Sequence, residues 1–272
     1  MNDTKHLRLL AALLLAAALP GCGSGPHLEV PTPPSSQYAS LRPLAIHAVS
    51  PQVVFVCGNL LLEDGTPEGL VLRSEDGGRR WARTAFEVRD LRRVTCQTVF
   101  FTDRLRGWVG AIRVTDEGVT RPIVLVTTDG GNHWRERVLP MAPSMIVTEI
   151  HSLSFDSEEV GTVVVQTADP ETFKLTETWY GTSDGGRNWE VLDDRFRVAP
   201  APRVATSTAA MVDKKRGFRL RPGADGGVTY VETTASGGKD WLPVHEMSLA
   251  ALDTYYQGDV TYGPVQRRSR AH

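Results

Sequence analysis

Histidines, cysteines and carboxylates are the side chains of this 272-residue sequence that could do chemistry. The six histidines that follow residue 21 have the spacing of neither a zinc site nor a Ser-His-Asp triad; they are His27, His47, His133, His151, His245 and His272. Asp64, Asp116 and Asp225 each lie in a glycine-containing segment, but one carboxylate in each is too few ligands for calcium. The sequence therefore predicts no metal centre and no cofactor.

The most informative carboxylates lie in an eight-residue segment that recurs four times, which we call the turn cassette. Its copies are residues 74–81, 127–134, 182–189 and 234–241. Each copy begins with Ser or Thr, carries two adjacent glycines and ends in tryptophan. The third and last residues are Asp76 and Trp81, Asp129 and Trp134, Asp184 and Trp189, and Ser236 and Trp241. The third residues are 53, 55 and 52 positions apart, a period that predicts structural repeats.

The chemistry of the cassette is that of a tight turn between two strands. A carboxylate at the third position can accept hydrogen bonds from the amides of the turn, and glycine adopts positive φ without strain. The tryptophan that follows is expected to pack beneath the turn or against a neighbouring unit. Because Ser236 replaces the carboxylate, we expect the fourth turn to be weaker than the others.

Short strands and hairpin turns are predicted around each cassette. Residues 64–66, 116–120 and 225–229 have the composition of hairpin turns between second and third strands. Fourth strands are expected to begin at the cassette tryptophans. Each unit is therefore predicted to be a four-stranded antiparallel meander without helices, and the fold class to be all-β.

The cassettes resemble the Asp-box, or BNR, repeat of sialidases, sortilin-type receptors and photosystem II assembly factors. The resemblance covers about residues 44–263, and residues 107–110 with the cassette that follows are most similar to the assembly factors. It implies a β-propeller of four-stranded antiparallel blades, with four repeats and a partial fifth at 252–263. It also implies that the cassette aspartates are structural and lie away from the active face.

Resemblance to the sialidases leaves one alternative open. A sialidase needs three arginines, a Tyr/Glu nucleophile pair, an aspartic acid and an Arg-Ile-Pro segment. Residues 41–44 match that segment only faintly, and Tyr255 and Tyr256 have no identifiable glutamate partner. We therefore expect a non-catalytic binding or assembly scaffold, with sialidase-like or other glycoside hydrolysis as the alternative.

The N-terminal residues have the pattern of an export signal. Lys5 and Arg8 precede a run of Leu and Ala over residues 9–19. Eleven helical residues reach only about 16 Å, roughly half the hydrocarbon thickness of a bilayer. The run therefore predicts a signal peptide over 1–21 and not a membrane span.

Residues 19–22 resemble a bacterial lipobox, which implies that Cys22 is lipidated. Two acyl chains on this residue are enough for stable membrane anchoring. A linker rich in Pro and Ser is predicted over 22–43, and the propeller over 44–272. We expect a lipid-anchored protein of the cell envelope, at the outer membrane in a Gram-negative organism, and a soluble secreted protein is the alternative.

Cys57 and Cys96 remain once Cys22 is acylated. They lie in adjacent repeats, and export places them in an oxidising compartment. These facts favour a disulfide between them, with two buried free thiols as the alternative.

Charge and topology indicate the class of partner. The 30 Lys and Arg against 32 Asp and Glu give a net charge of −2, which excludes a basic nucleic-acid binder. In a propeller the links between blades meet the hairpins of second and third strands on one face, where partners dock. The candidate binding face contains Arg89, Arg92, Arg93, Arg195, Phe196 and Arg197. Because Arg and aromatic side chains are enriched in interfaces, we expect an envelope protein or a glycan to bind there; solvated loops are the alternative.

Overall fold

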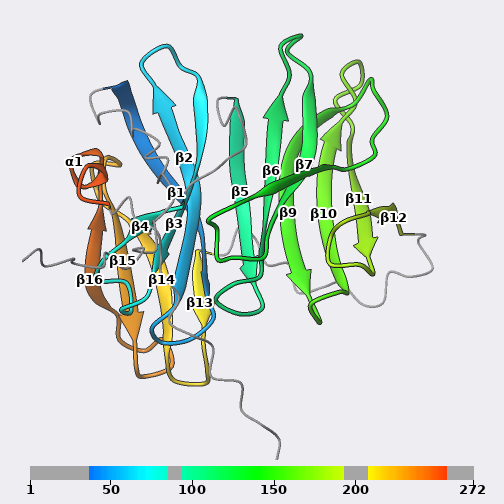
Figure 1. Cartoon of the computed structure of the whole chain (residues 1–272). Coiled ribbons are helices and arrows are strands. Elements are labelled where there is room, and N and C mark those ends of the chain that lie inside the picture. Colours follow the sequence, from blue (N-terminus) through cyan, green and yellow to red (C-terminus); the bar gives the residue numbers. More distant parts are fainter. Residues whose placement is uncertain (1–36, 85–92, 193–207, 256–272) are drawn as a thin grey trace, which may run out of the picture. The chain divides into compact units, whose positions relative to one another are not determined.

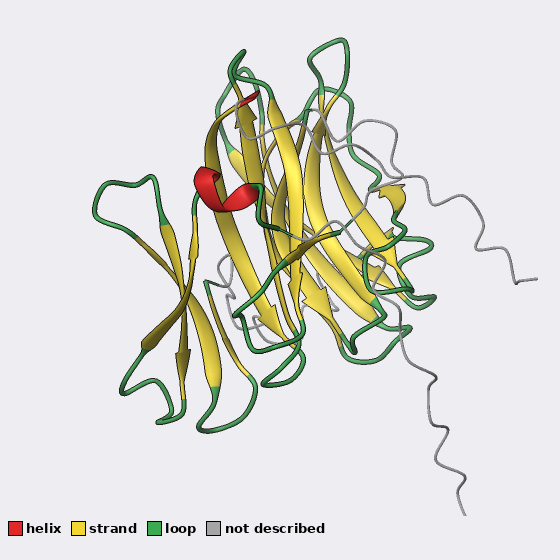
Figure 2. Ribbon diagram, turned by 60° about the vertical axis from the view of Figure 1, so that its left-hand side comes forward, coloured by secondary structure: helices red, strands yellow, loops and turns green. Residues whose placement is uncertain are grey.

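A computed structural model describes residues 37–84, 93–192 and 208–255 of the chain. The chain divides into two compact units, Met1–Pro31 and Thr32–His272, and every described element belongs to the second. Strands make up most of the described residues, and α1 is their only α-helix (Figures 1 and 2). The observed fold class is therefore all-β, as predicted.

Within the described ranges, sixteen strands form four antiparallel sheets of four strands each. The first sheet contains β1 (Tyr38–Ala48), β2 (Val54–Leu62), β3 (Pro67–Ser74) and β4 (Ala82–Arg83). The second contains β5 (Val94–Phe101), β6 (Gly107–Val114), β7 (Thr120–Thr127) and β8 (Arg135–Val138). The third contains β9 (Ile146–Phe155), β10 (Gly161–Ala168), β11 (Leu175–Thr182) and β12 (Glu190–Val191). The fourth contains β13 (Ala209–Met211), β14 (Gly217–Pro222), β15 (Thr229–Thr234) and β16 (Leu242–Met247).

Each sheet is a meander, because its strands pair in the order in which they occur along the chain. The hairpin turns predicted between second and third strands are present. Their glycines Gly65, Gly118 and Gly226 have φ values of 82°, 79° and 71°, which only glycine adopts without strain. The side chains of Asp64 and Asp225 accept hydrogen bonds from amides two residues further on. This is the local role expected of them.

The sheets pack face to face through three apolar cores. One core joins the fourth sheet to the first, a second joins the first to the second, and a third joins the second to the third. Figure 1 shows the four sheets in that order. Inner strands such as β6 are buried on both faces because a sheet lies on either side of them. Four meanders packed in this way are consistent with a propeller-like fold.

Aromatic stacking repeats at equivalent positions of two of these contacts. Phe55 of β2 stacks on Phe101 of β5 with a centroid distance of 3.5 Å. Trp108 of β6 stacks on Phe155 of β9 at 3.6 Å. In both contacts the second residue of the second strand reaches the end of the first strand in the next sheet, so these repeats share their packing as well as their turns.

Two predicted boundaries are wrong. The linker was expected to extend to residue 43, but β1 already begins at Tyr38, because Tyr38 and Leu41 are buried in the core of the first and fourth sheets. The partial fifth repeat was expected to begin with a strand near residue 252. Helix α1 (Leu249–Leu252) lies there instead, capped by Ser248, and Leu252 packs into the same core. Residues 256–272 lie outside the described residues.

The predicted signal peptide and Cys22 also lie outside the described residues. Among the residues that the structure does describe, no helix has the length and apolar character needed to cross a membrane.

Candidate functional site

The cassette carboxylates are used by the turns themselves. In the third cassette, one oxygen of Asp184 accepts the amides of Arg187 and Asn188 at 2.9 and 3.0 Å and the hydroxyl of Thr182 at 2.9 Å. The other oxygen accepts the side-chain amide of Asn188 at 2.7 Å. These hydrogen bonds, with that from the Asn188 amide the largest cause, lower the pKa of Asp184 to about 2. A carboxylate held ionised in this way cannot serve as a general acid near neutral pH.

The first two cassettes repeat this arrangement. Partial burial raises the pKa of Asp76 and Asp129, but hydrogen bonds from Arg80 and His133 outweigh it and hold both pKa values below their usual range. In the fourth cassette the hydroxyl of Ser236 accepts a backbone amide at 2.9 Å. The turn forms there without the carboxylate.

Each cassette is also tied to the turn between the first and second strands of its own sheet. The amide of its first glycine donates to a carbonyl of that turn at 2.7 to 3.0 Å; the pairs are Gly77 with Gln52, Gly130 with Leu105, Gly185 with Glu159, and Gly237 with Lys215. Both turns therefore lie at the same end of each sheet, which is the end opposite the hairpins of second and third strands. The cassettes are structural at this end.

Arg93 is the only residue of the predicted binding face that lies within the described ranges. Its amide donates to the carbonyl of Pro67 at 2.7 Å, and its guanidinium lies 3.2 Å from the carboxylate of Asp116. Arg93 therefore joins the start of β3 in the first sheet to a hairpin of the second sheet. Both features lie at the hairpin end, where the link between sheets was expected. Arg89, Arg92, Arg195, Phe196 and Arg197 lie outside the described residues.

A Tyr/Glu/Arg cluster in the first sheet was missed by the sequence analysis. The hydroxyl of Tyr38 donates to Glu68 at 3.1 Å, and Arg83 donates to the same oxygen at 2.5 Å. The cluster escaped notice because Tyr38 was assigned to the linker and its partners are distant in the sequence. Burial, reinforced by the Glu68 carboxylate, raises the pKa of Tyr38, whose exposed fraction is 4%. A buried phenol that holds its proton is poorly suited to act as a nucleophile.

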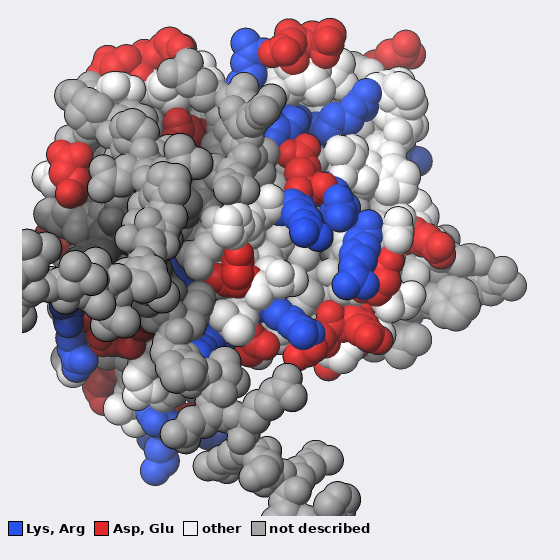
Figure 3. All heavy atoms as spheres, viewed as in Figure 1, with Lys and Arg blue, Asp and Glu red and all other residues white. Residues whose placement is uncertain are grey.

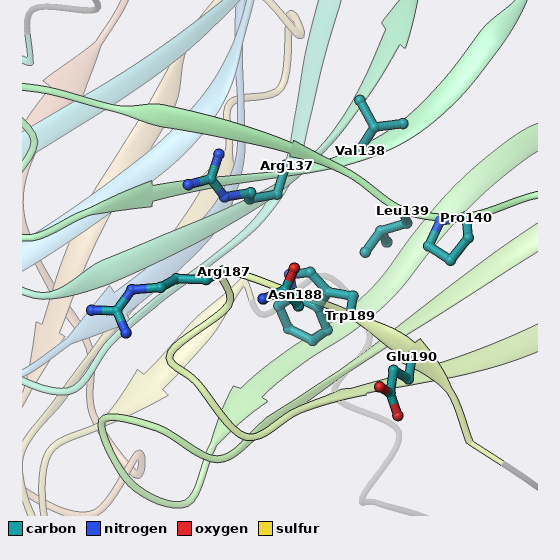
Figure 4. Close-up of a pocket in the computed structure, with 8 residues that line it drawn as sticks. All are labelled: Arg137, Val138, Leu139, Pro140, Arg187, Asn188, Trp189 and Glu190. Atoms are coloured by element: carbon teal, nitrogen blue, oxygen red, sulfur yellow. The ribbon is translucent and has the colours of Figure 1, made fainter.

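A groove lies between the second and third sheets. Its volume is about 510 Å³, and it is lined by the end of β8 and by the third cassette; the residues are Arg137, Val138, Leu139, Pro140, Arg187, Asn188, Trp189 and Glu190. Figure 4 shows Arg137 and Arg187 extending to the same side. Their guanidiniums offer N–H donors beside an apolar wall, and Glu190 adds one carboxylate to the lining. The groove can accept an acidic or hydroxyl-rich group.

Sequence reasoning missed this groove because its walls come from two different repeats. Arg137 belongs to the fourth strand of one repeat, and Arg187 to the cassette of the next. Only the packing of the second sheet on the third brings them together. The sequence feature that could have indicated the groove is an arginine in the fourth strand of one repeat together with an arginine in the cassette of the next repeat.

No candidate metal site is found in the described part of the chain. Within the described ranges, no group of three or more His, Cys, Asp or Glu could hold a metal ion. Acidic and basic side chains are interspersed over the face shown in Figure 3.

The disulfide favoured from the sequence is not formed in the structure. Cys57 of β2 and Cys96 of β5 are free, and both are fully buried in the core of the first and second sheets. The backbone of Cys96 is held by the side-chain amide of Asn59, and its sulfur lies over Gly69 of β3. Burial raises the pKa of Cys96 to about 12 and raises that of Cys57 well above its usual value. The structure therefore contains two free buried thiols, which was the alternative expectation.

Comparison with known proteins gives one distant relative in sequence. No family model matches the chain. The chain is 25% identical over 195 residues to the photosystem II assembly lipoprotein Ycf48 of Synechococcus sp. (strain CC9902), which covers 68% of this chain and 47% of the relative. The chain thus spans about half the length of this curated relative.

Solved structures of carbohydrate-active enzymes share part of the backbone arrangement. A Trypanosoma rangeli sialidase in complex with 2,3-difluoro-KDN is 17% identical with a TM-score of 0.40, over 75% of this chain and 37% of the sialidase. The polysaccharide lyase Uly1 is 9% identical with a TM-score of 0.40, over 78% of this chain and 50% of the lyase. Such low scores carry no argument about activity.

Proposed function

We propose that this chain is a non-catalytic binding or assembly protein of the cell envelope, built as a propeller whose blades are the four sheets. The observation that carries the proposal is the use of the repeated carboxylates. Those of Asp76, Asp129 and Asp184 accept the amides of their own turns, so the repeats supply a framework and no acid or base. The distant relative named as an assembly lipoprotein supports the same role.

Lipid anchoring at Cys22 is part of this proposal. It is supported by the lipobox-like sequence before Cys22 and by the word lipoprotein in the name of the relative. An anchored scaffold is held close to envelope proteins and glycans, and in a Gram-negative organism its place is the outer membrane.

The groove of Arg137 and Arg187 is the proposed contact site for the partner. It combines cationic donors with an apolar wall, which is the composition of an interface centre. The partner group that fits is a carboxylate or a cluster of sugar hydroxyls, because guanidinium N–H groups donate to both.

Glycoside hydrolysis is the second candidate, and the hydrogen bond between Tyr38 and Glu68 is the observation that favours it. It is the weaker candidate because the tyrosine is buried and its pKa is raised.

Capture from a detergent extract of the envelope tests the binding role. The chain with Arg137→Glu and Arg187→Glu should lose the partner that the unaltered chain retains. Arg135→Glu is the matched control, since Arg135 lies on the same strand, is exposed and does not line the groove. Equal recovery of partners by all three chains would remove the groove from the proposal.

A further inference from the structure

Among the described residues, the order of the sheets leaves two sheet faces outside the three cores. Because the cores join the fourth sheet to the first, the first to the second and the second to the third, the third and fourth sheets each have one face that belongs to none of them. We call these faces the third-sheet outer face and the fourth-sheet outer face. If one more sheet-on-sheet contact of the kind seen in the three cores were made, it would join these two faces.

The second glycine of each cassette shows that one such contact is missing. A Cβ atom on Gly78 would meet Val244 of the fourth sheet, and one on Gly131 would meet Thr84, which follows the first sheet. A Cβ atom on Gly186 would lie 2.9 Å from Trp108 of the second sheet. On Gly238, among the described residues, it would meet only Trp241 of its own cassette. The fourth cassette therefore packs against no preceding sheet within the described part of the chain.

The end of each first strand gives the same result. Phe101 and Phe155 are 2% and 7% exposed because each stacks on an aromatic ring of the preceding sheet. Met211, which ends β13 at the equivalent position, is 47% exposed. This independent observation again places the open contact on the fourth-sheet outer face.

The third-sheet outer face is acidic with an apolar edge. Glu149, Gln166 and Glu177 lie opposite one another on β9, β10 and β11. The neighbouring positions Ile146 and Leu175 pair with Ala168 and are 45% and 57% exposed. Residues 146–192 carry nine Asp and Glu against two Lys and Arg.

Histidine and lysine modify this charge only slightly. His151 lies between the two glutamates, with its ring nitrogens 3.4 Å from Glu149 and 3.6 Å from Glu177. Lys174 is exposed at the hairpin end of the same sheet. The carboxylates therefore outnumber the cationic side chains on this face.

The fourth-sheet outer face carries a cluster of arginine and aromatic side chains, which we call the arginine cluster. Arg219 and Arg221 both pair with Glu232, with nitrogen to oxygen distances of 2.6 Å. Their guanidinium groups lie 4.6 Å from the ring centres of Trp241 and Tyr230. Glu246 pairs with Tyr230 in the register and is exposed at the edge of the same face.

The arginine cluster replaces an apolar surface. The position of Arg219 corresponds to Val109 and Val163, which are fully buried in contacts with the preceding sheet. A face with arginine at these positions does not suit the dry contact made within the chain. It suits an acidic surface.

From these observations we propose that a second copy of this chain docks on these faces, with the third sheet of each copy against the fourth sheet of the other. A second copy is the occupant that the side chains indicate, because the acidic face and the partly exposed arginine cluster both belong to this chain. Two such contacts related by a two-fold axis cover all four outer faces, so the assembly closes as a dimer of eight sheets. The contact rests on charge and on partly exposed arginines, and it weakens as salt rises.

The test uses two variants of the full mature chain, with Cys22→Ser in place of the lipidated residue. In the first, Arg219→Glu, Arg221→Glu and Glu232→Arg invert the ion group while keeping its internal pairs. In the second, Glu149→Lys and Glu177→Lys reverse the opposite face. Glu171→Lys is the matched control, because Glu171 is exposed in the hairpin turn after β10 and does not lie on the paired strands of that face.

Sedimentation and light scattering should show a salt-sensitive dimer for the unaltered chain and for the control. Each variant alone should associate at least about tenfold more weakly, because like charges then meet at both contacts. An equimolar mixture of the two variants should recover the dimer, since the arginine cluster of one variant then meets the glutamates of the other, and the introduced lysines meet the introduced glutamates. Recovery also shows that both variants are folded.

Three results would overturn the proposal. They are an unaltered chain that stays monomeric at every concentration, dimers that persist in both variants, and variants of native circular dichroism that do not associate when mixed. Open polymers in place of dimers would also contradict the closed arrangement.

Discussion

Replacing Gly186 by alanine tests how the third cassette docks on the second sheet. Gly186 has φ of 83°, and an added Cβ would lie 2.9 Å from the indole nitrogen of Trp108. That nitrogen donates to the carbonyl of Gly185 at 2.9 Å. Alanine therefore brings backbone strain, displaces a buried indole and weakens a hydrogen bond between sheets.

Gly238→Ala is the matched control. Gly238 has φ of 84°, but the nearest atoms that an added Cβ would meet belong to Trp241, and none is closer than 3.6 Å. It thus isolates the backbone strain, about 1–2 kcal/mol. Displacing Trp108 adds about 1–3 kcal/mol for overpacking and about 1 kcal/mol for the hydrogen bond. We expect about 3–6 kcal/mol of destabilisation for Gly186→Ala.

Urea unfolding followed by tryptophan fluorescence measures both changes. The substitutions are made in the chain with Glu149→Lys and Glu177→Lys, so that no second copy lies against the fourth cassette. Since about 1 kcal/mol corresponds to roughly 2–4 °C in a chain of this size, thermal unfolding should separate the variants clearly. Equal destabilisation by the two substitutions would refute the inference that the cassettes pack on the preceding sheet.

Three further predictions concern acid stability, anchoring and the thiols. Burial lowers the pKa of His47 from 6.5 to about 4, so His47 takes up a proton at a higher pH in the unfolded chain than in the folded one. The free energy of unfolding should therefore fall as the pH drops from about 6.5 to 4. His47→Gln should make the urea midpoint less dependent on pH in this range. Cys22→Ala should release the protein from membranes in fractionation, and continued retention would contradict the lipid anchor. Because both pKa values are raised by burial, Cys57 and Cys96 should resist a thiol reagent in the native state and react after unfolding, whereas linked peptides in non-reducing mass spectrometry would show a disulfide.

The features that could be predicted from the sequence are those set by local chemistry. A cassette such as 182–189 contains its own hydrogen-bond acceptors and its positive-φ glycines, so its turn follows from the residues alone. The hairpins at Gly65, Gly118 and Gly226 are equally local. Strand order follows from these turns, since each connects consecutive antiparallel strands.

The features that could not be predicted depend on contacts between repeats. Residues 38–43 have a polar and proline-containing composition, and only burial against the fourth sheet makes Tyr38 part of β1. The groove of Arg137 and Arg187 requires the second and third sheets to pack together. The partial fifth repeat was likewise predicted by extending the spacing of the repeats past Met247. In the structure, the packing of Leu252 into the core favours a single helical turn there instead.

The claim that this chain binds and does not catalyse is tested most directly by turnover. The purified mature chain is incubated with fluorogenic sialosides and other glycosides, beside Tyr38→Phe and Glu68→Gln, which alter the one tyrosine and glutamate pair described above. We predict no release of fluorophore beyond that in buffer, for all three chains. Turnover by the unaltered chain that either substitution abolishes, with the fold retained, would contradict the account.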